Sequence, residues 1–242
     1  MSLSDECPPH LEASTWREVQ QVLAGEQSPL AVFDADGTLW ADDLGETHLH
    51  VLSDHDLVPA GEGYADLLEE YAARCAADVD DAYAWGARVC ADLDEETLRW
   101  SAEESWRRHR PLLLQPMASL VRALIASKVD VAVVSASNRW IIEAAVAELG
   151  IGAERVIAVD LERERGRLIP KVRQPMPNGQ GKVEAIKAYL NRAPTLAFGN
   201  SVHDLPMLEF STSGGLVLAT SAAQPALSSA LQEARALHAW SY

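Results

Sequence analysis

The heptapeptide Phe33-Asp34-Ala35-Asp36-Gly37-Thr38-Leu39 decides how the rest of the chain is interpreted. It overlaps Leu30-Ala31-Val32-Phe33, a short apolar run typical of a strand buried on both faces of a parallel sheet. Two carboxylates two positions apart at the end of such a strand both reach into one crevice if the strand stops after the first. Gly37 allows a sharp turn at that point. An acidic turn is the alternative interpretation, because Asp and Gly are also ordinary turn residues.

Outward from this stretch, apolar runs alternate with helical patterns. Strands are expected at 129–134, 155–159, 195–198 and 215–218, and a hairpin over 161–172 turning at Arg165-Gly166. Helices are expected at 12–24, 117–127, 138–149, 182–190, after His203-Asp204 and near 223–236. Such alternation predicts an α/β fold, a Rossmann-like, doubly wound parallel sheet with both faces covered.

Residues 43–110 interrupt this alternation, because they are rich in Ala, Leu, Glu and Arg and lack strand-like runs. We expect four helices there, at about 44–56, 62–77, 80–92 and 94–109. The predicted organisation is a Rossmann-like core made of residues 1–40 and 111–242, with an inserted α-helical cap over residues 41–110.

Composition excludes several classes of partner. The formal net charge is −16, so the chain lacks the basic footprint of a nucleic-acid-binding protein or of one that docks on anionic membranes. No run approaches the roughly 20 apolar residues of a membrane span, and residues 1–30 have no apolar signal region. Three cysteines without metal-site spacing (Cys7, Cys75 and Cys90) indicate reduced thiols. We therefore expect a cytoplasmic protein without nucleic-acid or membrane partners.

Three further polar segments are expected at the edge of the sheet where Asp34 lies. Ser135 ends one predicted strand, Lys182 begins a helix, and Asn200 and Asp204 belong to a loop after another strand. Ligands of open α/β sheets bind at the carboxyl ends of the strands, which favours a functional interpretation. Taken singly, each has a structural alternative: a turn or cap serine, a surface lysine, and a loop in which Asp204 caps the next helix.

In this order, the four segments resemble the four motifs of the haloacid-dehalogenase-like (HAD) superfamily. These motifs are a DxDGT loop, a strand-ending Ser or Thr, a Lys, and an acidic metal-binding loop. The resemblance extends from about Leu30 to Leu218 and implies a Mg²⁺-dependent phosphatase that hydrolyses a small-molecule phosphomonoester. The chain is most similar to the phosphoserine-phosphatase-like branch with a small helical cap. An Asp at position 36 separates it from the dehalogenase branch, which lacks that residue.

The resemblance also implies a role for each site residue. Asp34 would be the nucleophile and form an aspartyl-phosphate, and Asp36 would be the general acid and base. Ser135 and Lys182 would bind the phosphoryl group. Magnesium would be held by four residues: Asp34, Asp36 through its carbonyl oxygen, Asn200 and Asp204.

The chain departs from the family pattern at two places. Asn200 stands where the fourth motif usually has an Asp, which removes one negative charge from the metal site, and Ala136-Ser137 replaces the usual Gly-Gly. Two alternatives to the phosphatase therefore stay open. One is a phosphotransferase that uses the same intermediate, and the other is a non-catalytic protein that binds a phospho-ligand.

The start of the cap offers a prediction about the substrate. The stretch that contains Asp43 and Glu46 resembles the corresponding stretch of phosphocholine-type phosphatases, in which these carboxylates would pair with an ammonium group. An amine-bearing phosphate ester is thus a further expectation. Cap aromatic residues would add a cation–π face, although packing of the helices is the favoured explanation for them: Tyr64, Tyr71, Tyr83, Trp85, Trp100 and Trp106.

Overall fold

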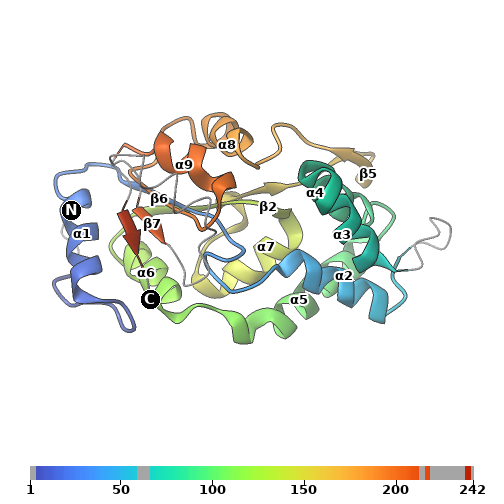
Figure 1. Ribbon diagram of the computed structural model, residues 1–242, viewed down its shortest axis with the longest axis horizontal. Coiled ribbons are helices and arrows are strands. Elements are labelled where there is room, and N and C mark those ends of the chain that lie inside the picture. The colour runs from blue at the N-terminus through green and yellow to red at the C-terminus, as the bar shows by residue number, and fades with distance from the viewer. Residues whose placement is uncertain (1–3, 59–65, 213–215, 219–237, 241–242) are drawn as a thin grey trace.

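The structure is a computed structural model that describes residues 4–58, 66–212, 216–218 and 238–240. Its central layer is a parallel sheet of four strands in the order β3-β2-β1-β6 (Figure 1). These strands are β1 (Leu30–Phe33), β2 (Asp130–Asn138), β3 (Val156–Val159) and β6 (Leu196–Phe198). Strand β1 lies between β2 and β6, so that Val32 pairs with Ala132 on one side and Ala197 on the other. This central position explains why all four residues of β1 are buried.

Helices cover both faces of the sheet because successive side chains of each strand point to opposite faces. Ala31 and Phe33 belong to one hydrophobic cluster, whereas Leu30 and Val32 belong to another on the opposite face. The first cluster is completed by α1 (Ala13–Leu23), α6 (Gln115–Ala126) and α7 (Arg139–Val146), and the second by α8 (Gln180–Leu190) and α9 (Leu205–Phe210). Figure 1 shows α8 and α9 above the sheet and α6 below it. The predicted doubly wound α/β fold is confirmed.

The helices inserted between β1 and β2 form a hydrophobic cluster of their own. They are α2 (Leu44–Asp54), α3 (Leu67–Ala77), α4 (Val79–Arg88) and α5 (Glu95–His109). Leu49 of α2, Tyr71 of α3, Trp85 of α4 and Leu98 of α5 pack together in it. In Figure 1, α2, α3 and α4 lie together at one end of the molecule, opposite α1. The division at residues 41–110 between cap and core stays a prediction.

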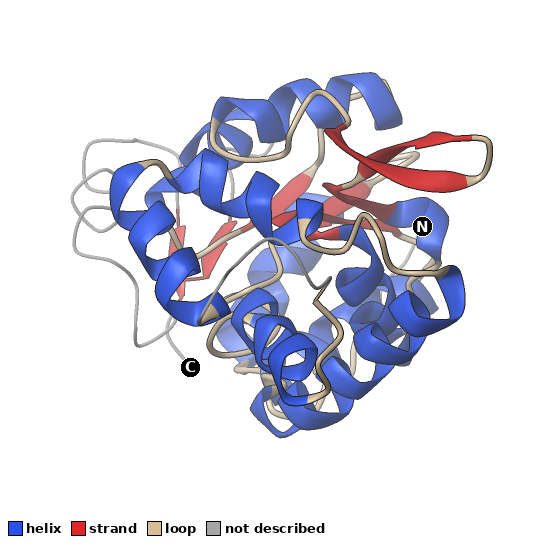
Figure 2. Ribbon diagram, turned by 90° about the vertical axis from the view of Figure 1, so that its right-hand side faces the viewer, coloured by secondary structure: helices blue, strands red, loops and turns tan. Residues whose placement is uncertain are grey.

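The predicted hairpin follows β3 directly. Strands β4 (Leu161–Glu164) and β5 (Arg167–Val172) pair in antiparallel fashion, and Figure 2 shows them projecting from the body of the molecule. The turn falls at Arg165 and Gly166, both of which have positive φ angles, of 50° and 84°. Glycine adopts such angles without steric cost, which is the signal that located this turn in the sequence.

Several boundaries differ from the expected ones for local reasons. Helix α3 begins later than expected because Asp66 caps it, accepting hydrogen bonds from the amides of Leu68 and Glu69. Helix α4 ends at Arg88, where the amides of Cys90 and Ala91 bond to carbonyls three residues earlier. Strand β2 was expected to end near Val134 but continues to Asn138, with an irregular register after Ser135.

Near the C-terminus, β7 (Leu216–Leu218) pairs in parallel with β8 (His238–Trp240), a strand that the sequence did not predict. The helix expected near 223–236 lies outside the described residues. Within the part of the chain that the structure describes, no helix is long and apolar enough to cross a membrane. The described ranges also contain short 3₁₀ segments: Arg110–Leu112, Ala147–Leu149, Ala153–Arg155 and Val202–Asp204.

Candidate active site

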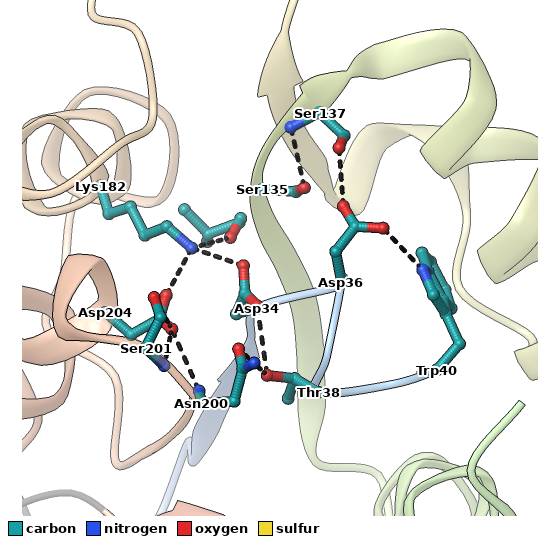
Figure 3. Close-up of polar contacts among 11 residues, drawn as sticks. Asp34, Asp36, Thr38, Trp40, Ser135, Ser137, Lys182, Asn200, Ser201 and Asp204 are labelled. Carbon is teal, nitrogen blue, oxygen red and sulfur yellow. Dashed lines mark hydrogen bonds and ion pairs between the residues drawn. The ribbon is translucent and has the colours of Figure 1, made fainter. Parts of the chain in front are cut away.

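Asp34 lies directly after β1, at the carboxyl edge of the sheet (Figure 3). Its amide continues the ladder by donating to the carbonyl of Phe198, at 2.9 Å, so the backbone of the nucleophile candidate is anchored to β6. The residue is buried, with 7% of its surface exposed. Its carboxylate therefore sits at the floor of a site rather than on an open surface.

Lys182, in the first turn of α8, reaches this floor. Its Nζ donates to Oδ1 of Asp34 at 2.6 Å, to Oδ1 of Asp204 at 2.7 Å and to the carbonyl of Val134 at 3.0 Å. All three donors of the ammonium group are thus used, and the side chain is buried. Burial alone would lower the pKa of Lys182, but Asp204 and Asp34 outweigh it and raise that pKa. The lysine is held as a cation.

Opposing effects act on the pKa of Asp34, the candidate nucleophile. Burial raises the pKa of Asp34 to about 7, and the charge of Asp204 adds to the rise, while Lys182 opposes it. One ammonium group is shared between two buried carboxylates, so it does not fully compensate either of them. A cation delivered to the free side of Asp34 would favour its ionised, nucleophilic form.

Asp204 organises the loop after β6. Its Oδ2 accepts hydrogen bonds from the amides of Asn200, at 3.0 Å, and Ser201, at 2.9 Å, and from the Ser201 hydroxyl, at 3.0 Å. Its Oδ1 is occupied by Lys182, and only 1% of the residue is exposed. In this arrangement Asp204 holds Lys182 and the loop in place, and both of its carboxylate oxygens already accept hydrogen bonds. Its role as a metal ligand stays a prediction.

Two other oxygens converge at Thr38. Its Oγ1 lies 3.1 Å from Oδ2 of Asp34 and 3.2 Å from Oδ1 of Asn200. The close approach of Asn200 depends on Gly37, because a Cβ at position 37 would lie 2.0 Å from Nδ2 of Asn200. Gly37 also has a φ of 74°, which favours glycine. The glycine of the DxDGT segment thus makes room for the asparagine.

These oxygens fit a weakly charged Mg²⁺ site. Among the described residues, no group of three or more His, Cys, Asp or Glu side chains has a metal-binding arrangement. Asp34 and Asn200 instead offer a carboxylate and an amide oxygen, and the Asp36 carbonyl is the third expected ligand. Such hard oxygens are the ligands magnesium prefers, and magnesium commonly needs few protein ligands because it retains waters. This set of oxygen donors fits Mg²⁺ and carries one formal negative charge, that of Asp34.

Asp36 is held on the opposite side from Lys182, as Figure 3 shows. Its Oδ1 accepts from Nε1 of Trp40 and from the amide of Leu44, both at 2.8 Å. Its Oδ2 accepts from the hydroxyl of Ser137 at 2.6 Å. Because Leu44 is the first residue of α2, the carboxylate also connects the core to the inserted helices.

Ser137 is a site residue that the sequence did not predict. Ser137 and Asn138 are both candidate caps of the following helix in the sequence, and Asn138 is the one that caps it, by accepting from the amide of Ile141. The spacing of two between Ser135 and Ser137 was the available signal, because such residues point to the same face of a strand. The Ser137 amide donates to Oγ of Ser135 at 3.1 Å, which leaves the hydrogen of the buried Ser135 hydroxyl available for a ligand.

The two carboxylates expected to bind substrate take different positions. Asp43 is the N-cap of α2, accepting from the amides of Gly45 and Glu46, and lies 3.4 Å from the hydroxyl of Tyr71. Burial raises the pKa of Asp43 to about 7, and the charges of Asp36 and Glu46 add to the rise. Glu46 is exposed. Among the residues that the structure describes, Asp43 therefore has no cationic hydrogen-bond partner, and it lies beside the site.

A small pocket lies between the inserted helices and the end of β2. It is lined by Gly45, Leu49, Tyr71, Tyr83, Gly86, Ala136, Ser137 and Asn138. Of the aromatic residues considered earlier, Tyr71 and Tyr83 line this pocket, whereas Trp106 packs against Trp40 and Trp100 against His55. Trp85 stacks behind Tyr71, and Tyr64 lies outside the described residues. Of these aromatic residues, Tyr71 and Tyr83 are thus the ones that the structure places at the pocket.

Comparison with known proteins agrees with this geometry. The family model described as haloacid dehalogenase-like hydrolase matches residues 31–209, and no curated protein matches the chain. A protein of unknown function from Bordetella pertussis Tohama I is similar in structure, with a TM-score of 0.75 and 22% identity over 88% of this chain and 98% of the other. A substrate-bound phosphoserine phosphatase has a TM-score of 0.57 and 16% identity, covering 88% and 93%. A HAD family hydrolase from Salmonella enterica serovar Typhi has a TM-score of 0.59 and 14% identity, covering 96% and 77%. At these identities the structural likeness shows the fold.

Proposed function

The chain belongs to the haloacid dehalogenase-like hydrolases, and from that premise we propose that it is a magnesium-dependent phosphatase acting on a small-molecule phosphomonoester. One observation carries the proposal. Asp34, the candidate nucleophile, is buried at a strand end with its Oδ1 fixed by Lys182, while Asp36 is held separately on the other side. A nucleophilic carboxylate and an independent acid–base carboxylate are what a two-step phosphoryl transfer requires.

In the first step, an oxygen of Asp34 attacks phosphorus in line with the leaving group. The bond between phosphorus and the leaving oxygen breaks, and that oxygen takes a proton from Asp36. The product is an aspartyl-phosphate on Asp34. In the second step Asp36 accepts a proton from a water molecule, which attacks phosphorus and releases inorganic phosphate and the Asp34 carboxylate.

The surrounding groups stabilise the phosphoryl charge. Lys182 is a buried cation in contact with Asp34, so its charge acts in a medium of low dielectric constant. Ser135 has a hydroxyl hydrogen available to donate to a phosphoryl oxygen. Asp204 holds Lys182 in position beside Asp34 because it binds the same ammonium group.

The metal would be held by Oδ2 of Asp34, Oδ1 of Asn200 and the carbonyl oxygen of Asp36. When bound, magnesium supplies positive charge that allows a carboxylate to approach a phosphate dianion. Asp204 belongs to this proposed site through the loop that it orders around Asn200.

We further propose that the substrate is an amine-bearing phosphate ester. Asp43 and Glu46 place negative charge where the non-phosphate part of a substrate would lie, and Lys182 is already occupied by Asp34 and Asp204. Tyr71 and Tyr83 line the adjoining pocket, and aromatic rings of this kind attract an ammonium group. A panel that pairs aminoalkyl phosphates with neutral alkyl phosphates of the same length tests this. Equal kcat/KM values within each pair would exclude the amine preference.

The decisive test of the function is release of inorganic phosphate from an aryl phosphate, with Mg²⁺ or with a chelator. We compare the wild type with Asp34→Asn and with Asp42→Asn, a control at an exposed neighbouring position whose left-handed φ of 60° asparagine tolerates. Metal-dependent release that only Asp34→Asn abolishes supports the phosphatase. Added alcohols that divert the phosphate into new esters would identify a phosphotransferase instead. Phosphate binding without release from any ester would indicate a phospho-ligand binding protein.

A further inference from the structure

The two oxygens of the Asp36 carboxylate have chemically different partners. Oδ1 accepts from the indole N–H of Trp40 and from the backbone N–H of Leu44. Both groups can only donate hydrogen bonds. Oδ2 accepts from the hydroxyl of Ser137, which can both donate and accept. The difference decides where a proton can reside.

A proton on Oδ1 would point toward two N–H groups, neither of which has a lone pair to receive it. The Asp36 carboxyl group held in this arrangement must therefore carry its proton on Oδ2. There the Ser137 hydroxyl donates to one side of Oδ2, which leaves the other side of this atom for the proton. Trp40 and Leu44 keep the same role in both states.

We infer that Ser137 is the positioning residue that holds Oδ2 of Asp36, the oxygen that carries the proton transferred in the proposed mechanism. The inference rests on the proposed phosphatase function. During formation of the aspartyl-phosphate, the Oδ2–H bond breaks and the leaving-group oxygen receives the proton, while the Ser137 hydroxyl continues to donate to Oδ2. During hydrolysis, Oδ2 takes a proton from the attacking water, and Ser137 holds this oxygen in the same position.

The fold places Ser137 for this task. Ser135 and Ser137 lie two apart on β2, and the Ser137 amide donates to the Ser135 hydroxyl oxygen at 3.1 Å (Figure 3). The serine proposed to bind the phosphoryl group and the serine that holds the proton donor are thus fixed relative to each other. Ser137 is 8% exposed, so solvent competes little for its hydroxyl.

The test compares two substrates that differ in their need for a general acid. An alkyl phosphate has a poor leaving group and needs the proton, whereas a nitro-substituted aryl phosphate leaves readily without it. We expect Ser137→Ala to lower kcat for the alkyl ester by roughly 10- to 100-fold, a part of the usual effect of general acid catalysis, and for the aryl ester by only about 2-fold. Ser137→Thr keeps the hydroxyl and should restore most of the alkyl activity.

Controls separate this effect from lost stability. Ser105→Ala removes a buried hydroxyl that bonds only to the carbonyl of Ser101 within α5, and it should affect both substrates equally and weakly. If Ser137→Ala does not fold, Ser137→Cys repeats the comparison with a side chain of similar size and poor hydrogen-bonding ability. An equal loss on both esters in the folded variant, or no recovery in Ser137→Thr, would overturn the inference.

The same assays distinguish failure of the inference from failure of the function. Wild-type activity that Asp34→Asn abolishes, together with equal losses for Ser137→Ala on both esters, rejects the role of Ser137 alone. Activity that survives in Asp34→Asn rejects the proposed mechanism itself, and the role of Ser137 falls with it.

Discussion

The ammonium nitrogen of Lys182 lies 2.6 Å from Oδ1 of Asp34, and both side chains are buried. The same nitrogen lies 2.7 Å from Asp204, which is also buried. Two buried carboxylates therefore share a single cation inside the protein. Removing a member of a buried ion cluster is costly because the remaining charges lose their compensation.

From this relationship we expect Lys182→Met to lower the free energy of unfolding by about 3 kcal/mol at neutral pH. The double variant Lys182→Met with Asp204→Asn removes one of the stranded charges and should recover part of that loss. Neither variant should release phosphate, because both lack the cation beside Asp34. Urea unfolding measures the stabilities, and a double variant less stable than the single one would contradict the argument.

Gly37 provides a second test, because two independent features require glycine there. Its φ is 74°, and an added Cβ would lie 2.0 Å from Nδ2 of Asn200. Gly25 is a matched control with a φ of 88° and no atom within 4 Å of an added Cβ. We expect Gly25→Ala to cost only the backbone strain, about 1 kcal/mol, with activity retained. Gly37→Ala should cost more in thermal unfolding and reduce activity at least tenfold, since Asn200 is displaced. Equal effects of the two variants would argue against the contact.

The metal requirement should respond to the charge at position 200. Asn200→Asp adds a carboxylate next to Asp34, so we expect the Mg²⁺ concentration for half-maximal activity to fall by roughly tenfold, equivalent to about 1.4 kcal/mol. Asn200→Ala removes the amide oxygen and should raise that concentration. Titration of phosphate release with Mg²⁺ gives both values, and removal of the metal by chelation should stop turnover in all three proteins. An unchanged requirement in Asn200→Asp would place the metal elsewhere.

The sequence located those parts of the site that follow a strand directly. Asp34 and Asp36 were predicted because an apolar run precedes them, and Lys182 because a cation at a helix start is unfavourable without a partner. Its partners prove to be Asp34 and Asp204, which lie 148 and 22 residues away in the chain. The sequence marked the lysine as unusual, but only the packing of α8 against the sheet supplies the reason.

The contacts of Ser137 and His48 could not be predicted from the neighbouring sequence. Ser137 lies beyond residue 134, where the strand was expected to end, and its contact with Asp36 spans 101 residues. His48 contacts Asn138 across 90 residues, with no pattern in either segment to indicate it. Strand β8 was not predicted because His238–Trp240 is too short to give a clear pattern. It is a strand because it pairs with β7. Such contacts depend on tertiary packing rather than on spacing.

Substrate selectivity should depend on Asp43. Asp43→Asn keeps an oxygen that can cap α2, so the helix should remain intact. It removes the negative charge beside Tyr71, however, and we expect the KM for an aminoalkyl phosphate to rise at least tenfold. The KM for the neutral alkyl phosphate of the same length should change less than threefold, which makes it the internal control. A parallel rise for both esters would show that Asp43 supports the site without recognising an amine.

The last prediction concerns the buried His48, which joins the inserted helices to the core. Its Nε2 lies 3.0 Å from Oγ of Ser101 on α5, and its Nδ1 lies 3.3 Å from Nδ2 of Asn138. Burial lowers the pKa of His48 from 6.5 to about 3, and the amide of Asn138 offers donors to Nδ1 rather than an acceptor. The folded protein therefore binds fewer protons at His48 than the unfolded chain between these values. The stability that depends on His48 is complete above pH 6.5 and is lost progressively as the pH falls toward 3.

Between pH 6.5 and 4.5 we expect the free energy of unfolding, measured with urea, to fall by about 2 kcal/mol more in the wild type than in His48→Gln. The control is His50→Gln, an exposed position on the same helix, whose stability should change with pH as that of the wild type does. Parallel pH profiles for the wild type and His48→Gln would show that His48 is not held neutral.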